Sequence, residues 1–342
     1  MSDEETEATV ETGTTPVGAG EPVLVTGGAG YIGSHACLAL ARAGFQPVAF
    51  DDLSTGNADA VRWGPLVIGD IGAPESLREV FARHQPIAVL HFAAKAYVGE
   101  SVVDPRRYYR TNVAGSLRLL EAVLDHGSPP IVFSSSCATY GVPNHVPIRE
   151  DTAQQPINPY GATKLTVERA LADFGEAYGL RSVVLRYFNA AGADPRAVIG
   201  ERHDPETHLI PRVLEAATGD GTIIEVFGDS HPTPDGTCIR DYIHVVDLAD
   251  AHVRALHWLL AGQGSLTVNL GTGTGASVRE VIAVAAEVVG TPVDHRIAPA
   301  RAGDPPSLVA SAELAKERLG WQPRRSDLRT IITDAWRWHQ LR

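Results

Sequence analysis

Short apolar runs alternate with stretches of helical periodicity along the first half of the chain. The runs are rich in β-branched residues and do not alternate with polar positions, which is typical of parallel strands covered by helices on both faces. This order predicts an α/β fold built on a Rossmann-type, doubly wound parallel sheet. The strand-like runs are 23–25, 47–50, 66–68, 87–91, 131–134 and 182–185, and the helical stretches are 31–43, 75–83, 106–125 and 160–178.

The pattern loosens after about residue 190, which predicts a smaller C-terminal α/β domain. Stretches rich in Pro, Gly, Asp and His occupy 193–205 and 229–236, and long loops in a compact chain are often binding elements. The N-terminal segment, mostly Glu, Thr and Gly, has too few apolar residues to order itself. We therefore expect a disordered acidic tail at 1–20, a Rossmann domain at 21–190 and a second domain at 191–342, with a segment around 240–270 returning to the first.

Composition narrows the class of protein. The chain has 342 residues, 44% hydrophobic and 20% charged, as in a soluble globular protein. Its 29 Lys and Arg against 41 Asp and Glu give a net charge of -12, which argues against nucleic acid as a partner because phosphate binding needs a basic surface. The N-terminus does not resemble a signal peptide, and no apolar run approaches the ~18 residues of a membrane span, so we expect no membrane attachment. The scattered Cys37, Cys137 and Cys238 form no disulfide framework, which indicates a cytoplasmic location.

A glycine-rich segment directly follows the first predicted strand. Gly27, Gly30 and Gly33 are spaced three apart and lead into a predicted helix. In a dinucleotide-binding turn, the first glycine allows the tight turn, the second lets a pyrophosphate approach the backbone and the third lets helix and strand pack closely. The N–H groups at the helix start then face the anion. We therefore predict a dinucleotide site that includes Tyr31 and Ile32.

Asp51 ends the second predicted strand, close to the ~20 residues expected after a dinucleotide fingerprint. A carboxylate at this place can accept both hydroxyls of an adenosine ribose and repels a 2′-phosphate, so it favours NAD over NADP. Asp70 and Ile71, after the third predicted strand, are candidates to frame the adenine. The alternatives are an ordinary loop acid at Asp70 and, for the whole pattern, a structural turn with a surface Asp.

Tyr160 and Lys164 form a YxxxK pair at the start of a predicted helix. Residues i and i+4 share one helix face, so the phenol and the ammonium can act together. A free tyrosine, with a pKa of about 10, is a poor base at neutral pH, but a nearby Lys⁺ and a positively charged nicotinamide both favour the phenolate. Ser136 ends a run of serines after a predicted strand. Such pairs are common on helix surfaces, and the nucleotide segment makes proton transfer the favoured interpretation.

Together these segments resemble the UDP-glucose 4-epimerase family of the extended short-chain dehydrogenase/reductase superfamily. The resemblance runs from Pro22 nearly to the C-terminus. It implies that the C-terminal domain binds a UDP-sugar. The most specific stretches are 25–35, 91–102, 133–141, 185–192, 204–211, 234–250, 269–271 and 301–304.

The resemblance implies an NAD-dependent isomerase that inverts C4 of UDP-glucose or UDP-galactose through a transient 4-keto sugar. Tyr160 would take the proton of the 4-hydroxyl and Ser136 would hold that oxygen. Lys164 would lower the pKa of the tyrosine and bind the nicotinamide ribose. The hydride would pass to NAD⁺ and return to the opposite face of the sugar, so the resemblance implies a tightly bound, recycled NAD.

The resemblance also implies positions for the sugar nucleotide and the cofactor. Arg240 and Arg301 suit a diphosphate because guanidinium groups form charge-assisted forks with it, and surface salt bridges are the alternative for each. Phe92 and Asn112 match positions near the cofactor, although Phe92, like Phe188, has core packing as its alternative. The other UDP positions are Asn189, Leu209, Phe227, Tyr242 and Asp304.

Three positions depart from the family pattern. Lys95 stands one residue before the lysine of many relatives, and either reaches the cofactor or is solvated. Leu308 replaces the sugar-gating Tyr of some relatives, which leaves N-acetyl sugars open. Arg196 stands near the arginine with which uronate-specific relatives pair the sugar carboxylate. UDP-glucuronate is therefore the alternative substrate, and a solvated loop residue is the alternative for Arg196.

Two other functions share this fold. A sugar-nucleotide dehydratase needs acid and base groups directly after the active-site hydroxyl, where Cys137 and Ala138 stand instead. The other is a nucleotide sensor that has lost catalysis. The presence of Ser136, Tyr160 and Lys164 together argues against it, because a sensor does not need them. Relatives commonly pair through two helices per subunit, here those after Asp104 and Tyr160, so we expect a homodimer, with packing inside one chain as the alternative.

A short segment combines residue types that bind metals. His203, Asp204, Glu206 and His208 lie within six positions, interrupted by Pro205. No tetrahedral spacing and no outer shell of supporting groups is evident in the sequence. We therefore expect a loop on the substrate side and no metal.

Overall fold

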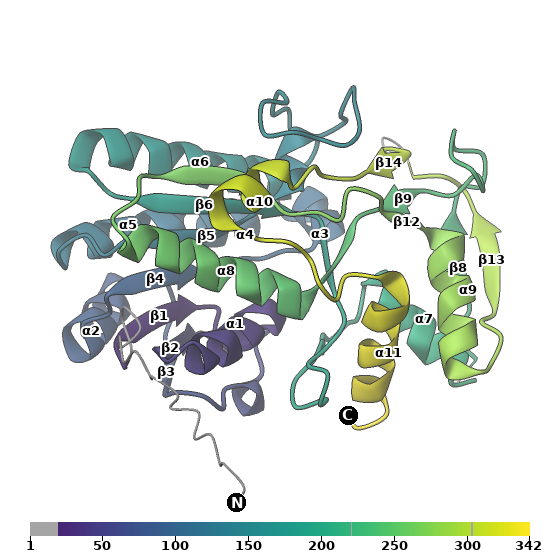
Figure 1. Cartoon of the computed structure of the whole chain (residues 1–342), viewed down its shortest axis with the longest axis horizontal. Coiled ribbons are helices and arrows are strands. Elements are labelled where there is room, and N and C mark those ends of the chain that lie inside the picture. Colours follow the sequence, from purple (N-terminus) through teal and green to yellow (C-terminus); the bar gives the residue numbers. More distant parts are fainter. Residues whose placement is uncertain (1–19, 220, 302–303) are drawn as a thin grey trace, which may run out of the picture.

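A seven-stranded parallel sheet lies at the centre of the larger of the two parts of the molecule (Figure 1). The computed structural model describes residues 20–219, 221–301 and 304–342, so the predicted tail at 1–20 lies outside the described residues except for Gly20. The predicted α/β fold with a Rossmann-type parallel sheet is confirmed. In sheet order the strands are β11 (Leu266–Asn269), β6 (Ser182–Tyr187), β5 (Ile131–Ser136), β4 (Ala88–His91), β1 (Pro22–Thr26), β2 (Gln46–Asp51) and β3 (Leu66–Ile68).

Helices cover both faces of this sheet, as its apolar strands require. Side chains alternate across a strand, so Val23 and Val25 of β1 face one core cluster and Leu24 faces the other. The first cluster lies under α1 (Tyr31–Arg42) and α8 (Val245–Leu260), which pack side by side. The second lies under the remaining sheet helices, α2 (Pro74–His84), α5 (Ser116–Asp125) and α6 (Pro159–Tyr178).

The sheet order creates one edge suited to a site. The chain runs from β1 outward through β2 and β3, then returns to β4 on the other side of β1 and continues through β5 and β6. In open α/β sheets, ligands bind outside the carboxyl ends of the strands at such a reversal of order. Asp51 ends β2 and Ser136 ends β5, so both candidate residues lie at this edge.

The predicted helix at 106–125 is interrupted in the structure. Pro105 starts the short helix α4 (Pro105–Tyr108), and the Asp104 side chain accepts a hydrogen bond from the Arg107 N–H at 3.3 Å. A wider π-helical segment, η2 (Tyr109–Gly115), then leads into α5. Such insertions are frequent at functional sites. Three other short helices are α3 (Val98–Val103), η1 (Ala58–Ala60) and η3 (Cys137–Tyr140).

The C-terminal part has its own core beside the carboxyl edge of the large sheet (Figure 1). Its helices are α7 (Leu209–Ala217), α9 (Val278–Val289) and α11 (Leu328–His339). The small sheets pair β7 (Asn189–Ala191) with β10 (Tyr242–His244), β8 (Ile224–Phe227) with β13 (His295–Ala298), and β9 (Ile239–Arg240) with β12 (Ala276–Ser277) and β14 (Ser307–Leu308).

Three elements of the second half pack with the large sheet. Strand β11 pairs with β6, α8 covers β5 and β6, and α10 (Glu313–Leu319) packs on α8 and β11. The chain therefore passes between its two parts more than once. Within the described residues, every helix is too short or too polar to cross a membrane.

Candidate active site

The glycine segment forms the turn between β1 and α1. Gly27 has a φ of 72°, and a Cβ added to it would lie 2.7 Å from a backbone nitrogen of the loop after β4. A Cβ on Gly33 would lie 2.1 Å from the Gly27 carbonyl oxygen. Gly30 is the N-cap of α1, whose first N–H groups have no partner inside the helix. We call this turn, formed by Gly27, Gly30 and Gly33, the glycine cradle. Side chains at Gly27 and Gly33 would collide with the backbone, and the turn fits the pyrophosphate of a dinucleotide.

Asp51 lies at the rim of this cradle and is 8% exposed. Its Oδ2 accepts a hydrogen bond from the Ala29 N–H at 3.0 Å and its Oδ1 accepts one from the Leu53 N–H at 2.9 Å. Burial raises the pKa of the carboxyl group, and the two backbone N–H groups oppose the rise. A carboxylate offers about four acceptor positions, so both oxygens remain able to receive the hydroxyls of a ribose.

The other residues predicted beside the cofactor have varied surroundings. The Tyr31 hydroxyl donates to the Gly192 carbonyl oxygen at 2.6 Å and so links α1 to the C-terminal part. Ile32 is half-buried against the first core cluster. Asp70 is exposed and accepts the Gly72 N–H of its own turn at 2.7 Å, whereas Ile71 is 4% exposed in the second core cluster.

Asn112 joins three segments around the cradle. Its Oδ1 accepts the Lys95 N–H at 2.8 Å, and its amide donates to the Lys95 carbonyl at 3.0 Å and to Thr163 Oγ1 at 3.1 Å. Lys95 is 9% exposed, and its ammonium donates to Ser54 Oγ at 2.6 Å, so it is not solvated. Phe92 packs on the His252 ring with 4.5 Å between centroids, in line with its core alternative.

The serine, tyrosine and lysine predicted to transfer a proton converge at the start of α6. Asn158 caps this helix by accepting the Gly161 N–H at 2.9 Å, which places Tyr160 in its first turn. The Ser136 side chain, at the end of β5, lies close enough to Tyr160 to favour its ionised form. Lys164 follows one turn later, 6.0 Å from the centroid of the Tyr160 ring, and its ammonium donates to the Ser134 carbonyl at 2.8 Å.

Burial has the largest effect on the pKa values of Tyr160 and Lys164. It raises the pKa of Tyr160 to about 12, although the Ser136 side chain acts in the opposite direction. It lowers the pKa of Lys164 to about 8, although the charge of Glu168 opposes the shift. The phenol is therefore neutral at pH 7 by its own surroundings, and the expected lowering of the tyrosine pKa by Lys164 stays a prediction.

Sequence reasoning missed a buried ion pair behind these residues. Arg186 of β6 donates to both carboxylate oxygens of Glu168, with its Nη2 at 2.6 Å from Oε2, and its Nη1 donates to the Tyr140 hydroxyl at 2.7 Å. The Ser135 hydroxyl also donates to Glu168. Glu168 lies one helical turn after Lys164, and this i+4 spacing was the available signal.

The residues predicted to contact UDP lie in pairs on neighbouring elements. Tyr242 of β10 stands in register with Asn189 of β7. The Arg301 guanidinium lies 3.8 Å from the centroid of the Phe227 ring, which ends β8. Leu209 begins α7 and packs against the C-terminal core, and Leu308 stands in register with Arg240.

Arg240 is held from several sides. It forms an ion pair with Asp304, and its Nη1 donates to the carbonyl oxygens of Ile239 at 2.8 Å and Pro305 at 3.0 Å. A guanidinium fixed in this way has little conformational freedom left to lose on binding. The surface-salt-bridge alternative does not describe it, since its side chain is only 16% exposed.

Arg196 does not lie with the proton-transfer residues. Its side chain is 69% exposed, and its Nε lies 3.8 Å from Asp194. Asp194 also pairs with Arg42, which ends α1, so this turn lies near the far end of a helix whose start forms the cradle. These contacts are those of a solvated loop arginine.

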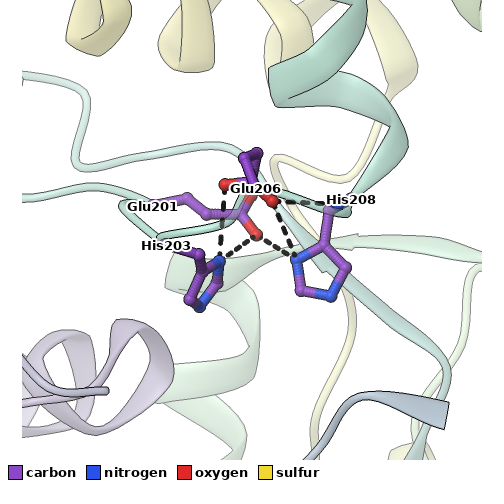
Figure 2. A group of neighbouring side chains, drawn as sticks. All are labelled: Glu201, His203, Glu206 and His208. Carbon is purple, nitrogen blue, oxygen red and sulfur yellow. Dashed lines mark hydrogen bonds and ion pairs between the residues drawn. The ribbon is translucent and has the colours of Figure 1, made fainter. Parts of the chain in front are cut away.

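The segment after Gly200 brings metal-binding residue types to one point. Figure 2 shows Glu201, His203, Glu206 and His208 with their side chains pointing toward one another. Three of these residues were considered from the sequence, whereas Glu201 was missed and Asp204 lies outside the group. Their convergence depends on irregular backbone that no periodic pattern predicts.

Known proteins resemble this chain over most of its length. The family model for the NAD dependent epimerase/dehydratase family matches residues 23–271. The UDP-glucose 4-epimerase of Rhizobium meliloti (strain 1021) is 54% identical over 320 residues, which are 94% of this chain and 97% of the relative. The crystal structure of UDP-glucose 4-epimerase from Brucella ovis in complex with NAD has a TM-score of 0.91 at 55% identity, covering 93% of this chain and 98% of the other.

A more distant structure shows the same fold. The UDP-glucose 4-epimerase from Bifidobacterium longum in complex with NAD+ and UDP has a TM-score of 0.89 at 35% identity, covering 94% of this chain and 98% of the other. These relatives confirm the resemblance and the predicted cofactor class, and their names do not support the UDP-glucuronate alternative. The chain therefore belongs to the NAD dependent epimerase/dehydratase family and groups within it with the UDP-glucose 4-epimerases.

Proposed function

We propose that this chain is an NAD-dependent isomerase that interconverts UDP-glucose and UDP-galactose by inverting C4 of the sugar. The proposal is carried by the convergence of Ser136, Tyr160 and Lys164 at the carboxyl edge of the sheet, where Ser136 and Lys164 are buried and the Ser136 side chain acts on the pKa of Tyr160. The names of the relatives supply the identity of the sugar nucleotide.

The cradle and its rim would hold NAD. The turn at Gly27, Gly30 and Gly33 would receive the pyrophosphate, and Asp51 would receive the adenosine ribose and disfavour a 2′-phosphate. Lys164 and Asn112 would border the nicotinamide side. When bound, NAD supplies a group that accepts a hydride from C4 and returns it. Because the two transfers cancel, the cofactor has no reason to leave, and we propose that it stays bound between cycles.

The chain's own residues would move the proton. The Ser136 hydroxyl would orient the 4-oxygen of the sugar, and the proton would pass between that oxygen and the Tyr160 hydroxyl. With a pKa of about 8, Lys164 is mostly protonated at pH 7, and its charge favours the tyrosinate once other positive charge enters the pocket. The pocket thus holds a neutral phenol at rest and an activated one only when loaded.

The C-terminal part would hold the UDP group. The ion pair to Asp304 and the carbonyl contacts fix Arg240, and the Phe227 ring supports Arg301. Both guanidinium groups would bind the diphosphate. We propose Asn189, Leu209, Phe227, Tyr242 and Asp304 as the other contacts of UDP.

A dehydratase remains disfavoured by the residues after Ser136. Burial raises the pKa of the Cys137 thiol well above its usual range, so the thiol stays neutral and is no base. Ala138 has no ionisable group. The acid and base groups that a dehydratase places here are not provided by these two residues.

A direct assay tests the activity. The purified chain is incubated separately with UDP-galactose, UDP-glucuronate and UDP-N-acetylglucosamine, without added NAD, and the products are separated. We expect UDP-glucose from UDP-galactose and nucleotide absorbance in the protein. Turnover of UDP-glucuronate alone would contradict the assigned substrate, and no conversion even with added NAD would contradict the activity.

We also propose a homodimer formed through the helices that follow Asp104 and Tyr160. The π-helical segment η2 packs beside α6, and Tyr109 and Leu117 on this stretch are 46% and 36% exposed. Sedimentation should give twice the 36.4 kDa chain mass, and Leu117→Glu should shift it to the monomer. The control is Ile68→Glu, whose parent side chain is 69% exposed at the far edge strand β3. An unchanged mass for Leu117→Glu would contradict this surface.

We propose a cytoplasmic location. Cys37, Cys137 and Cys238 are all buried and free, which suits a reducing compartment. Fractionation of the source cells should place the chain with cytoplasmic enzymes, and recovery outside the cytoplasm would contradict the proposal.

A further inference from the structure

The loop between the Ala193–Gly200 bridge and α7 carries four inward-facing side chains, those of Glu201, His203, Glu206 and His208 (Figure 2). One donor atom from each lies within 4.8 Å of every other. Both histidines present Nδ1 to the group, and both glutamates present a carboxylate oxygen. Two imidazoles and two carboxylates are a donor set that suits zinc and similar divalent transition metals.

The distances around His203 match a four-coordinate site. A tetrahedron of N and O donors at 2.0–2.2 Å from a zinc ion has edges of about 3.3–3.6 Å. His203 Nδ1 lies 3.4 Å from an oxygen of Glu201 and 3.4 Å from an oxygen of Glu206. His208 Nδ1 is in direct contact with Glu201 and lies 3.8 Å from Oε1 of Glu206, the oxygen that does not face His203. The contact between His208 and Glu201 has to open for a metal ion to enter the centre.

Two of the donor atoms lack a hydrogen-bond partner among the described residues. They are His203 Nδ1 and Glu206 Oε2, and both are buried. The Glu206 side chain is only 6% exposed, and a buried carboxylate oxygen without a hydrogen bond is costly. Its other oxygen accepts the N–H groups of Thr207 at 2.8 Å and His208 at 2.9 Å, so the carboxylate is held with the free oxygen toward the centre.

The surroundings fix the donors in place. The Glu201 carbonyl oxygen accepts the Trp338 indole N–H at 2.9 Å, which ties this residue to α11. The His203 ring lies edge-on to Tyr31 and Tyr97, with centroid distances of 6.3 and 5.9 Å. Tyr31 belongs to the first turn of α1. The group therefore bridges the cradle side of the molecule and the C-terminal part.

We propose that these four residues bind one divalent transition metal ion of the zinc type. Two carboxylates balance its charge, and four protein donors leave no open position, which is the arrangement of structural rather than catalytic zinc sites. The ion would brace the loop that leads into Leu209 and α7. None of the four side chains is among the residues proposed to transfer the proton, so the site does not depend on the proposed epimerase activity.

Metal content of the full chain is the first test. The chain is expressed with zinc available, dialysed into metal-free buffer and analysed by mass spectrometry of the metals. We expect about one zinc per chain in the wild type and in His145→Ala, an exposed histidine outside the group. His203→Ala and Glu206→Gln should bind zinc at least about a hundredfold more weakly, since changes around a site cost 10- to 100-fold even when the ligands remain.

Cobalt gives a geometric readout that does not depend on activity. Co²⁺ added to the metal-free chain should produce the strong visible bands of a tetrahedral ion in the wild type and in His145→Ala, and not in His203→Ala. Circular dichroism shows whether each variant is folded. If His203→Ala fails to fold, Glu206→Gln keeps the size of the side chain and decides the question.

Two results would overturn the proposal. One is a folded wild type that holds no zinc after expression with the metal and binds Zn²⁺ no more tightly than Glu206→Gln does. The other is stoichiometric binding that survives in both His203→Ala and Glu206→Gln, which would place the ion elsewhere. In the first case the four side chains are a hydrogen-bonded cluster that orders the loop without metal.

Discussion

Two groups of titratable side chains, one around Tyr160 and Lys164 and one in the loop of Glu201, His203, Glu206 and His208, differ in what controls their protons. At Tyr160 and Lys164, burial dominates, so the pKa of the phenol rises to about 12 and that of the ammonium falls to about 8. In the loop group, ion pairing outweighs burial. Despite burial, the two glutamates raise the pKa of His203 to about 9, and the histidines lower that of Glu201 to about 2.

The physical difference is the presence of a charged partner of opposite sign. A buried charge loses its hydration, and only a close counter-charge with good geometry restores the loss. Lys164 donates to a carbonyl and lies a helical turn from Glu168, which is already neutralised by Arg186. Burial therefore disfavours charge on Tyr160 and Lys164, and we propose that charge develops there when NAD and the sugar nucleotide bind. The loop side chains form ion pairs without a bound ligand. The predictions below test this contrast, from the largest effect to the smallest.

Tyr160→Phe should have the largest effect, because it removes the proton-transfer group and leaves the packing. We expect turnover of UDP-galactose to fall about 10²- to 10⁴-fold, the usual contribution of general acid–base catalysis. Tyr178→Phe, on the same helix with a side chain that is 61% exposed, is the control and should match the wild type. Equal loss in both variants would mean that helix integrity, not the phenol, limits the reaction.

Glu201→Gln should be the most destabilising change, because it removes the charge of the more deeply buried of the two glutamates that pair with His203 and His208 and leaves only Glu206 to balance them. Breaking a buried pair on one side costs about 3–5 kcal/mol, and the free energy of unfolding measured in urea should fall by about 3 kcal/mol. Glu287→Gln, in the exposed pair with Arg329, should change it by less than about 1 kcal/mol. If both variants lost a similar free energy of unfolding, the ion pairs of the loop group would stabilise the chain no more than an exposed ion pair does.

Lys164→Met should act in the opposite direction on stability. It removes a buried ammonium with a lowered pKa at the cost of one hydrogen bond, worth about 1 kcal/mol. We expect the free energy of unfolding at pH 7 to rise by about 1–2 kcal/mol while turnover is lost. A destabilised Lys164→Met would show that the ammonium is better compensated than its burial indicates.

The pH dependence of stability is the smallest expected effect. The folded chain releases the Lys164 proton at about pH 8 and the unfolded chain at 10.5, so the unfolded state binds more protons between these values. Stability from this group therefore rises with pH, by about 1 kcal/mol between pH 8 and 9. Subtracting the profile of Lys164→Met from that of the wild type should isolate the rise, and a flat or falling difference would contradict the lowered pKa.

Local patterns predicted the elements at the carboxyl edge well. The strands before Gly27, Asp51 and Ser136 are short and apolar, and the structure places all three residues at that edge. Interruptions were harder to predict, and the helix at 106–125 breaks at η2 although its periodicity continues. Strand β11 was not predicted as a strand of the sheet, because it follows a long detour through the C-terminal part.

Contacts between distant residues account for what the sequence did not predict. The Glu168–Arg186 pair joins a helix to a strand 18 positions away, and nothing in either segment indicates its partner. Arg196 had the right chemistry for a carboxylate, but the Asp194 turn holds it away from the proton-transfer residues. Lys164 lies on the expected face beside Tyr160, yet burial decides the direction of both pKa shifts.

The sequence by itself determined the parallel α/β fold, the glycine cradle and the Tyr160–Lys164 pair. Each of these depends on spacing within one segment, where the geometry of a strand, a turn or a helix is nearly fixed. Only the tertiary structure decided which buried groups carry charge and that Glu201, His203, Glu206 and His208 converge. Burial and counter-charges come from segments far apart in the chain, and irregular backbone has no period that a sequence can display.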